Sequence, residues 1–209
     1  MYHPIHLLSR NTKTGRSIDL PLQGHCRPSP NCAHDCYART GHQARPDAIK
    51  KHEFMSRYLA GTDQTELIQE CRLFTAVRLC GSGDLNPEHV PAILRLAKSC
   101  PQTMFWGMTR KPEIAGALNN RLPNLRVLLT VDSSSPDSVW NYQGALCFGP
   151  RRPGDEVPED PRIITVFPRH FGGRVVKGVQ RHRKDCLSVW HELPGCHACK
   201  RCWSWKNFN

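Results

Sequence analysis

The eleven cysteines of this 209-residue chain, and their uneven placement, constrain its fold more than any other feature. An odd number cannot all pair as disulfides, and buried structural thiols have no reason to cluster, whereas metal ligands do. Seven of them form two sets, one near each end: Cys26, Cys32 and Cys36, and Cys186, Cys196, Cys199 and Cys202. This distribution predicts two metal sites built from cysteine thiolates.

The first set lies on an irregular, proline-rich stretch that covers residues 21–36. Three thiolates can hold three irons of a four-iron cube and leave the fourth iron open to another ligand, whereas structural zinc normally takes four protein ligands. For zinc, the fourth ligand would be His25, His34 or a distant residue. We therefore favour an open-iron 4Fe-4S cluster at this site and keep zinc as the alternative.

The second set contains a tight run, Cys196-x2-Cys199-x2-Cys202, with Cys186 further upstream. Such a run is more typical of iron–sulfur ligation than of zinc, which prefers separated pairs. The four thiolates predict a fully ligated four-iron cluster or a closed tetrahedral zinc site. We expect residues 181–209 to be a Cys-rich metal-binding tail. Because the free energy of metal binding contributes directly to folding, either metal would fold this segment, which otherwise has no core. It would pack on an α/β domain formed by residues 1–180.

The compartment expected for this chain keeps its thiols reduced. No apolar run approaches the roughly 18 residues that a membrane helix needs, and the start lacks the pattern of a secretory signal. We therefore expect a cytoplasmic protein, where disulfides are rare. The four remaining cysteines lie in apolar surroundings and are interpreted as small buried residues: Cys71, Cys80, Cys100 and Cys147.

The chain is basic, with a formal net charge of +11. Such a charge favours a polyanionic partner or a phosphate-bearing substrate, although a solvated basic surface explains it almost as well. Two segments are candidates for anion contact, Thr109-Arg110-Lys111 and the basic run over residues 169–184, because the arginine fork suits phosphate and carboxylate. Nucleic acid is therefore a candidate partner, and no membrane is expected.

Between the two cysteine sets, predicted strands alternate with predicted helices. Strands are expected at residues 73–79, 103–108, 125–131, 145–148 and 163–167, and helices at 46–59, 66–72, 87–99 and 112–118. This alternation favours a parallel sheet with right-handed crossovers. About five strands are too few to close an eight-stranded barrel. The predicted fold is therefore α/β, a partial (β/α) barrel with parallel strands.

Polar residues follow several of these strands, at the carboxyl ends where such folds carry their chemistry. Gly81 and Gly83 allow a ligand to approach the backbone closely, and Asp84 is suited to accept hydrogen bonds from an amine. A tight strand–helix turn explains the same residues about equally well. The other polar ends are Thr109-Arg110, Asp132-Ser133 and residues 168–170. Together these ends predict a single site mouth.

In their order along the chain, these motifs resemble the radical S-adenosylmethionine enzymes: a cysteine triad ending in Cys36-Tyr37-Ala38, a glycine-rich acidic strand end, then strand–helix alternation. More closely, the chain is similar over nearly its whole length to the phage "gene 88 protein" group. The further shared residues are Asn11-x-Lys13-x-Gly15, Leu20-Pro21, Gly83-Asp84, Thr109-Arg110, Asp132-x-Ser134 and the C-terminal cysteines. The resemblance implies a phage- or mobile-element-encoded protein in a bacterial host.

The resemblance also implies roles for individual residues. The cluster on Cys26, Cys32 and Cys36 would bind S-adenosylmethionine at its open iron and take an electron from an external donor. Tyr37 would lie near the adenine, and the methionine amine would meet the strand end formed by Gly81, Ser82, Gly83 and Asp84. Cys186, Cys196, Cys199 and Cys202 would hold an auxiliary cluster like that of several radical enzymes. Apart from the resemblance, if the protein is such an enzyme, we expect substrate contacts from Arg110, Asp132 and Arg169, of which Asp132 and Arg110 are the candidate catalytic residues.

Three functions are compatible with these features. The first is a radical S-adenosylmethionine-like iron–sulfur enzyme, whose unknown substrate bears phosphate or is related to nucleic acid. The second is a zinc- or cluster-stapled module that binds nucleic acid or protein without catalysis, favoured by the charge and by the aromatic tail with Trp203, Trp205 and Phe208. The third is an iron–sulfur enzyme whose open iron acts directly on a substrate.

Overall fold

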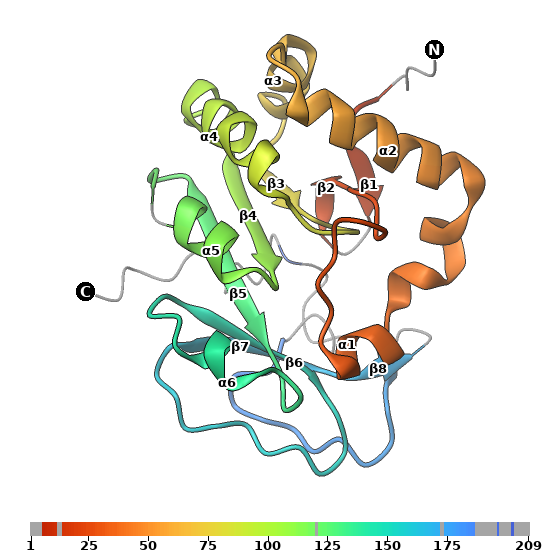
Figure 1. The fold of residues 1–209 in the computed structure, drawn as a ribbon, viewed down its shortest axis with the longest axis vertical. Helices are drawn as coiled ribbons and strands as arrows, with labels where there is room; N and C mark the ends of the chain where they lie inside the picture. The colour runs from red at the N-terminus through yellow and green to blue at the C-terminus, as the bar shows by residue number, and fades with distance from the viewer. Residues whose placement is uncertain are drawn as a thin grey trace.

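A seven-stranded sheet forms the centre of the protein in the computed structural model, which describes residues 6–11, 14–119, 121–171 and 174–186 together with Cys196 and Cys202. The strands follow chain order from β1 to β7. Strands β1 and β2 pair antiparallel, and each later pair is parallel. Within the described residues β7 does not pair with β1, so the sheet is mostly parallel and not closed (Figure 1).

The strands are short, as expected for elements separated by helices and loops. The seven strands of the sheet are β1 (Ser9–Asn11), β2 (Gly15–Ile18), β3 (Ala76–Leu79), β4 (Met104–Thr109), β5 (Leu125–Val131), β6 (Leu146–Arg151) and β7 (Ile163–Pro168). A separate antiparallel pair follows, formed by β8 (His170–Phe171) and β9 (Arg174–Val175). Beyond it, Asp185 bridges to Val166 of β7 in parallel, which extends the sheet by one contact.

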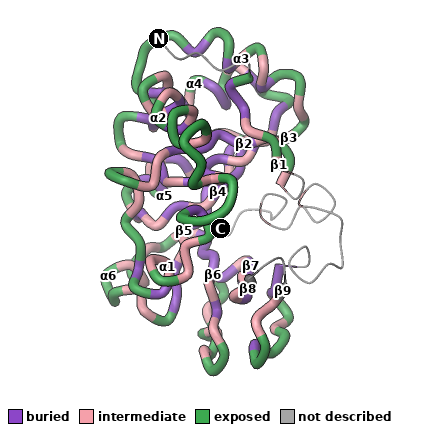
Figure 2. Tube along the Cα trace, turned by 90° about the vertical axis from the view of Figure 1, so that its right-hand side faces the viewer, coloured by how far each residue is buried: buried purple, intermediate pink, exposed green. Residues whose placement is uncertain are grey.

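The larger helices lie on one side of the sheet, where Figure 2 shows α2, α4 and α5 beside the strands. The α-helices are α1 (Pro30–His34), α2 (Pro46–Ala60), α3 (Thr65–Cys71), α4 (Val90–Ser99), α5 (Pro112–Leu118) and α6 (Asp137–Trp140). Three 3-10 turns complete the set: η1 (Tyr37–Arg39), η2 (Gly41–Ala44) and η3 (Pro87–His89). The cavity described below lies on the opposite side of the sheet.

Strand residues alternate between the two sides, because successive side chains of a strand point to opposite faces. Val77 and Phe105 point to the helices and pack in one fully buried cluster with Ile93 and Leu96 of α4. Burying each such side chain contributes about 1.5–3 kcal/mol to folding. Trp106, the residue after Phe105 in β4, points to the other side of the sheet, where it lines a cavity.

The predicted α/β class and parallel sheet are confirmed, and several elements match closely. Helix α5 and strand β5 have the predicted bounds, whereas the hairpin of β1 and β2 was not predicted. The helix expected over residues 87–99 is divided into η3 and α4. Pro91 explains the division, because a proline has no amide hydrogen to donate to the preceding turn.

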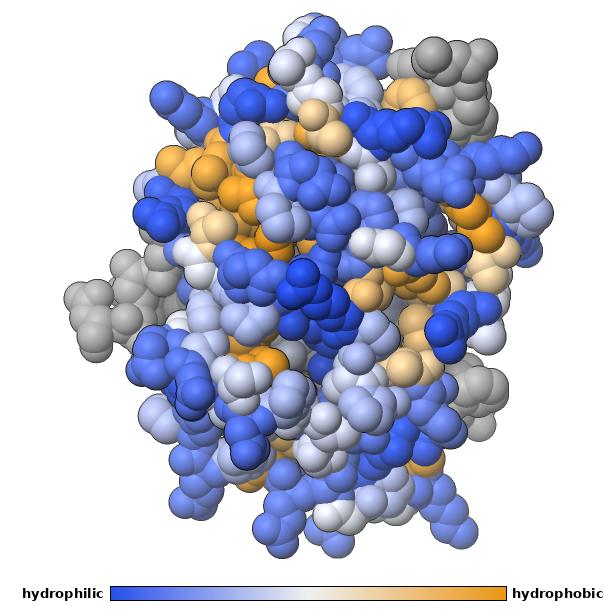
Figure 3. Space-filling view, in the orientation of Figure 1, coloured by the Kyte–Doolittle hydropathy of each residue, from blue (hydrophilic) through white to orange (hydrophobic). Residues whose placement is uncertain are grey.

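Hydrophilic side chains cover most of the helix-bearing side, and apolar side chains form separate patches there (Figure 3). In the described part of the chain, the exposed large hydrophobic residues are Tyr37, Ile49 and Leu73, which are far apart in the sequence. None of the helices in that part is long and apolar enough to cross a membrane.

Candidate functional site

The loop that carries the first three cysteines is fixed by the start of helix α1. Ser29 is the N-cap, and its hydroxyl accepts a hydrogen bond from the backbone amide of Cys32 at 3.2 Å. Pro30 follows at the first helical position, which suits the fixed backbone angle of proline. This helix presents Cys32, and the chain then turns so that Cys36 precedes η1.

Helix α1 is held against the end of β5 by Asp132, which is fully buried. The Ser29 hydroxyl donates to Asp132 Oδ2 at 2.5 Å, and Arg110 Nη2 forms an ion pair with the same oxygen at 2.9 Å. Ser134 donates to Asp132 Oδ1 through its amide and its hydroxyl. Burial alone would raise the pKa of Asp132, but these hydrogen bonds and the Arg110 charge hold that pKa below its ordinary value.

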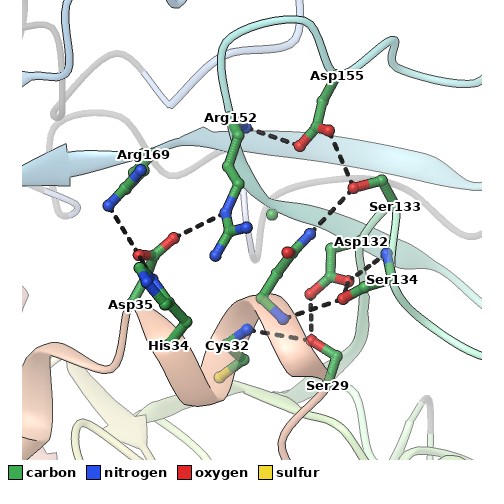
Figure 4. Close-up of polar contacts among 12 residues, drawn as sticks. Ser29, Cys32, His34, Asp35, Asp132, Ser133, Ser134, Arg152, Asp155 and Arg169 are labelled. Carbon is green, nitrogen blue, oxygen red and sulfur yellow. Dashed lines mark hydrogen bonds and ion pairs between the residues drawn. The ribbon is translucent and has the colours of Figure 1, made fainter.

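A second carboxylate, Asp35, anchors the end of the same helix (Figure 4). Arg152 Nε lies 3.0 Å from Asp35 Oδ2, and Arg169 Nη2 lies 2.9 Å from Oδ1. His34 Nδ1 lies 2.7 Å from Oδ1. Burial opposes ionisation, but the bonds from His34 and Arg152 and the arginine charges keep the pKa of Asp35 lowered. The two arginines tie the cysteine loop to the ends of β6 and β7.

The glycine-rich turn after β3 packs tightly against the end of β2. A Cβ atom at Gly81 would lie 2.3 Å from Asp19 Oδ1, and one at Gly83, where φ is +71°, would lie 2.2 Å from the Leu20 carbonyl oxygen. Gly83 therefore requires glycine, whereas a side chain at Gly81 would force the Asp19 and Ser17 side chains to move. The Tyr37 hydroxyl donates to the Gly81 carbonyl oxygen at 2.5 Å, which brings two predicted cofactor-binding residues together.

Asp84, predicted to meet an amine, lines the cavity described below, and its carboxylate accepts two hydrogen bonds from the protein backbone. Its Oδ1 accepts from the Leu85 amide at 2.8 Å, and its Oδ2 accepts from the Arg110 amide at 3.0 Å. Burial raises the pKa of Asp84 despite these donors. The buried carboxylate thus joins the ends of β3 and β4.

These strand ends and the cysteine loop border a cavity of about 420 Å³ on the side of the sheet that faces away from the helices. Among the predicted site residues, Tyr37, Gly81, Gly83, Asp84 and Arg110 line it, whereas Ser82 and Asp132 lie behind the wall. Eight cysteines also line it: Cys26, Cys32, Cys36, Cys80, Cys147, Cys186, Cys196 and Cys202. Cys199 lies outside the described residues. The described members of the two predicted cysteine sets therefore share one cavity.

The thiols surround this cavity without converging on one point. Among the described residues, no three Cys, His, Asp or Glu side chains lie close enough together to hold a metal ion. Burial raises the pKa of the Cys26 thiol to about 12, with Asp84 adding to the shift, and burial also raises the pKa of Cys32. A metal bound here would therefore displace protons from these thiols.

The two histidines near this loop are already engaged in hydrogen bonds. His25 Nδ1 lies 3.2 Å from the Asp84 carbonyl oxygen, and its Nε2 lies 3.2 Å from the Ser56 hydroxyl. The ring also stacks on His89, with 5.4 Å between centroids. His34 Nδ1 contacts Asp35. A zinc ion using His25 as its fourth ligand would have to break one of these contacts.

Several site residues were not predicted. Ser29 has a local signal, because it is a helix N-cap before a proline. Asp35 has another, because it is an acid between two candidate ligands, Cys32 and Cys36. The partners of Ser29 and Asp35, however, are about a hundred residues away in the sequence. Cys80 and Cys147 are buried core residues, as predicted, and both also line the cavity, which was not predicted. Cys80 also has a φ of +57°, which is unusual for a residue with a side chain.

Comparison with known proteins places the chain in a family. A family model described as "Gene product 88" matches residues 7–204, nearly the whole length. No curated protein and no solved structure matches the chain. The resemblance to the phage gene 88 group is thereby confirmed, and the resemblance to radical S-adenosylmethionine enzymes stays a prediction. The chain belongs to the gene product 88 family.

Proposed function

We propose that this protein is an iron–sulfur enzyme whose N-terminal cluster, held by Cys26, Cys32 and Cys36, keeps one iron open for S-adenosylmethionine. The observation that carries the proposal is the position of these three thiols. A short, tightly anchored loop brings them to the rim of one cavity, at the carboxyl ends of parallel strands. That is where α/β folds of this kind bind ligands.

The order of the strands in the sheet supports the proposal. Strands that follow one another in chain order, with the larger helices on one side, are what a partial (β/α) barrel requires. In such a barrel the other side of the sheet is the interior, and here that side carries the cavity. We therefore propose the partial barrel as the finer description of the fold.

The thiol-rich wall favours iron–sulfur chemistry over zinc at the first site. Soft thiolate ligands suit both metals, but a structural zinc site needs a fourth protein ligand. His25 is held at both ring nitrogens and His34 at Nδ1. An open fourth position leaves room for a cofactor beside Tyr37, Gly81 and Gly83, which line the cavity.

The roles proposed for the chain's own residues follow from their contacts. Tyr37 and the Gly81–Gly83 backbone bind and orient the cofactor. Arg110 lines the cavity and contacts an anionic group of the substrate, while Asp132 holds Arg110 and the cysteine loop in place. When bound and reduced by an external donor, the cluster supplies the electron that cleaves S-adenosylmethionine.

The test is paramagnetic resonance on the reduced protein, purified without oxygen. We expect a cluster signal that S-adenosylmethionine perturbs, and we expect Cys32→Ala to abolish that perturbation. Cys71→Ala is the matched control, because Cys71 is buried in the helix-packed cluster away from the cavity. A cluster signal unchanged by S-adenosylmethionine in the wild-type protein would reject the proposal.

A second candidate, a metal-stapled nucleic-acid-binding module, is favoured by the net charge of +11. A protein that neutralises several phosphates binds more weakly as salt rises, with a steep linear dependence on a logarithmic scale. Steep salt dependence with zinc and without sulfide would support this candidate. Weak binding that is insensitive to salt would count against it.

A further inference from the structure

One of the four arginines that line the cavity, Arg78, differs from the others in having no acidic partner. The other three form ion pairs: Arg27 with Glu113 at 2.7 Å, Arg110 with Asp132 at 2.9 Å, and Arg169 with Asp35 at 2.9 Å. Among the described residues, no carboxylate lies within 4.0 Å of the Arg78 guanidinium to form such a pair.

Arg78 lies inside strand β3 and points to the cavity, since Val77 and Leu79 on either side of it pack in the helix-side cluster. Its Cζ lies 5.6 Å from the centre of the ring of Trp106, its direct partner on β4. Its Nε is shielded from solvent and forms no hydrogen bond with any described residue. An aromatic face compensates a shielded charge only in part, so the guanidinium lacks a counter-ion.

The two acids closest to this part of the sheet do not supply that counter-ion. Asp19, which follows β2, does not line the cavity, and its Oδ2 lies 4.0 Å from His52 Nε2. Asp84 lines the cavity, but its two oxygens accept hydrogen bonds from backbone amides. The counter-charge of Arg78 is therefore left to a ligand.

A second polar group that borders the cavity is also unsatisfied. Thr165, on β7, is buried at 1% exposure and lines the cavity. Its hydroxyl forms no hydrogen bond with any residue in the described part of the chain. Buried polar groups are nearly always hydrogen-bonded, so two unsatisfied groups around one cavity indicate a polar ligand.

We propose that the cavity binds a substrate with a carboxylate group, and that Arg78 holds this carboxylate beside the Trp106 ring. One guanidinium balances one negative charge, and its planar edge matches the two oxygens of a carboxylate. A phosphate monoester carries about −1.5 to −2 at neutral pH and matches a single arginine less well. Arg110, whose charge Asp132 already balances, adds hydrogen-bond donors.

The inference rests on the proposed function for the idea that the substrate enters this cavity, and it adds the class of that substrate. Arg78 lies within β3, whereas Gly81 and Gly83, proposed to orient the cofactor, lie beyond the end of that strand. A substrate carboxylate at Arg78 therefore leaves the strand end to S-adenosylmethionine, which carries a carboxylate of its own.

The experiment is isothermal titration calorimetry of the full chain, purified without oxygen, with benzoate as the probe and uncharged benzamide as its counterpart. We expect benzoate to bind, and both benzamide in the wild type and benzoate in Arg78→Met to bind about tenfold more weakly or worse, because a charge-assisted hydrogen bond is lost. Absence of benzoate binding to the wild type, or wild-type affinity in Arg78→Met, would overturn the inference.

Arg16→Met is the matched control. Arg16 is also a half-buried strand residue over an aromatic ring, 4.7 Å from the centre of Phe74, but it does not line the cavity. We expect wild-type affinity for benzoate in this variant. An equal loss of affinity in Arg16→Met and Arg78→Met would overturn the assignment to Arg78.

Thermal unfolding first establishes that each variant folds. If Arg78→Met does not fold, Arg78→Lys keeps the charge but removes Nε and the planar fork. Benzoate should then bind about tenfold more weakly or worse, as expected when a bidentate contact is lost. Wild-type affinity in Arg78→Lys would overturn the inference.

Two competition measurements identify the anion and its source. Inorganic phosphate should displace benzoate only weakly, and a phosphate affinity above that of benzoate would overturn the carboxylate assignment. Saturating S-adenosylmethionine should leave benzoate bound. Displacement of benzoate by S-adenosylmethionine would overturn the inference, since the carboxylate at Arg78 would then be that of the cofactor.

Two further outcomes separate the inference from the proposed function. Benzoate binding that depends on Arg78, together with a cluster signal indifferent to S-adenosylmethionine, supports the inference and rejects the proposed function. A signal perturbed by S-adenosylmethionine, with equal benzoate affinity in the wild type and Arg78→Met, does the reverse.

Discussion

The two sides of the sheet are made by the same strands but differ in chemistry. The helix-covered side is filled mainly by aliphatic and aromatic residues, including Ile93, Leu96 and Phe105. The cavity side carries thiols, arginines and hydroxyls, some without hydrogen-bond partners among the described residues. The comparison teaches that one side of each strand stabilises the fold and the other is kept for a ligand, at some cost in stability.

The largest effect is expected from Asp132→Ala, at the junction of the two sides. The change leaves the Arg110 guanidinium partly buried without its carboxylate and removes the acceptor of Ser29. We expect a loss of about 3–5 kcal/mol in the free energy of unfolding, because one partner of a buried ion pair is removed. Urea unfolding measures this loss, and metal analysis measures the loss of N-terminal iron.

The control for that variant is Asp137→Asn, which alters an exposed acid at the start of α6. Wild-type stability and iron content in Asp132→Ala would show that the cysteine loop does not depend on this pair.

Leu96→Ala tests the helix-covered side alone. The side chain is fully buried, so the cavity created should cost about 2–5 kcal/mol in urea unfolding. Leu94→Ala, on the same helix but only partly buried, should cost less. Metal content should be unchanged in both folded variants, since neither residue lines the cavity. Loss of metal from folded Leu96→Ala protein would contradict the claim that the helix-covered side contributes to stability but not to metal binding.

Asp35→Asn should have a smaller effect, confined to the cavity rim. It weakens contacts to Arg152 and Arg169 and should cost about 1.5–3 kcal/mol, as expected for charge-assisted hydrogen bonds. The native pKa of Asp35 is lowered, so the unfolded chain binds that proton more readily. Its contribution is therefore complete above the ordinary pKa of about 3.9 and is lost as pH falls through the native pKa.

Unfolding free energies measured between neutral and acidic pH test this sign. The wild type should lose more stability on acidification than Asp35→Asn does. Parallel pH profiles for the two proteins would exclude a stabilising charge at Asp35.

The smallest effects come from a matched pair of glycines. Gly83→Ala places a Cβ in a left-handed residue against the Leu20 carbonyl oxygen and should cost at least about 1–2 kcal/mol. Gly116→Ala, in α5 with open space around it, should gain about 0.5–1 kcal/mol because alanine favours helix. Thermal unfolding of both variants measures the difference, and a neutral Gly83→Ala would mean that the turn has room to move.

Local patterns predicted much of the sheet, because the apolar run of β5 and the helical spacing of apolar residues in α5 can be recognised from those residues alone. The β1–β2 hairpin was missed because its strands have only three and four residues, too few to show a period. The Ser29–Asp132 contact spans 103 residues, and no local pattern predicts it. The burial of Cys147 was predicted correctly. Its position on the cavity side was not predicted, because a buried thiol in an apolar strand gives the same pattern whichever side of the sheet it faces.

The most direct test of the central claim, that the cavity side holds metal on thiolates, is a count of iron and acid-labile sulfide per chain after purification without oxygen. We predict about eight of each, as two four-iron clusters require. Protein that folds without iron or sulfide, or that carries zinc alone, would contradict the iron–sulfur assignment.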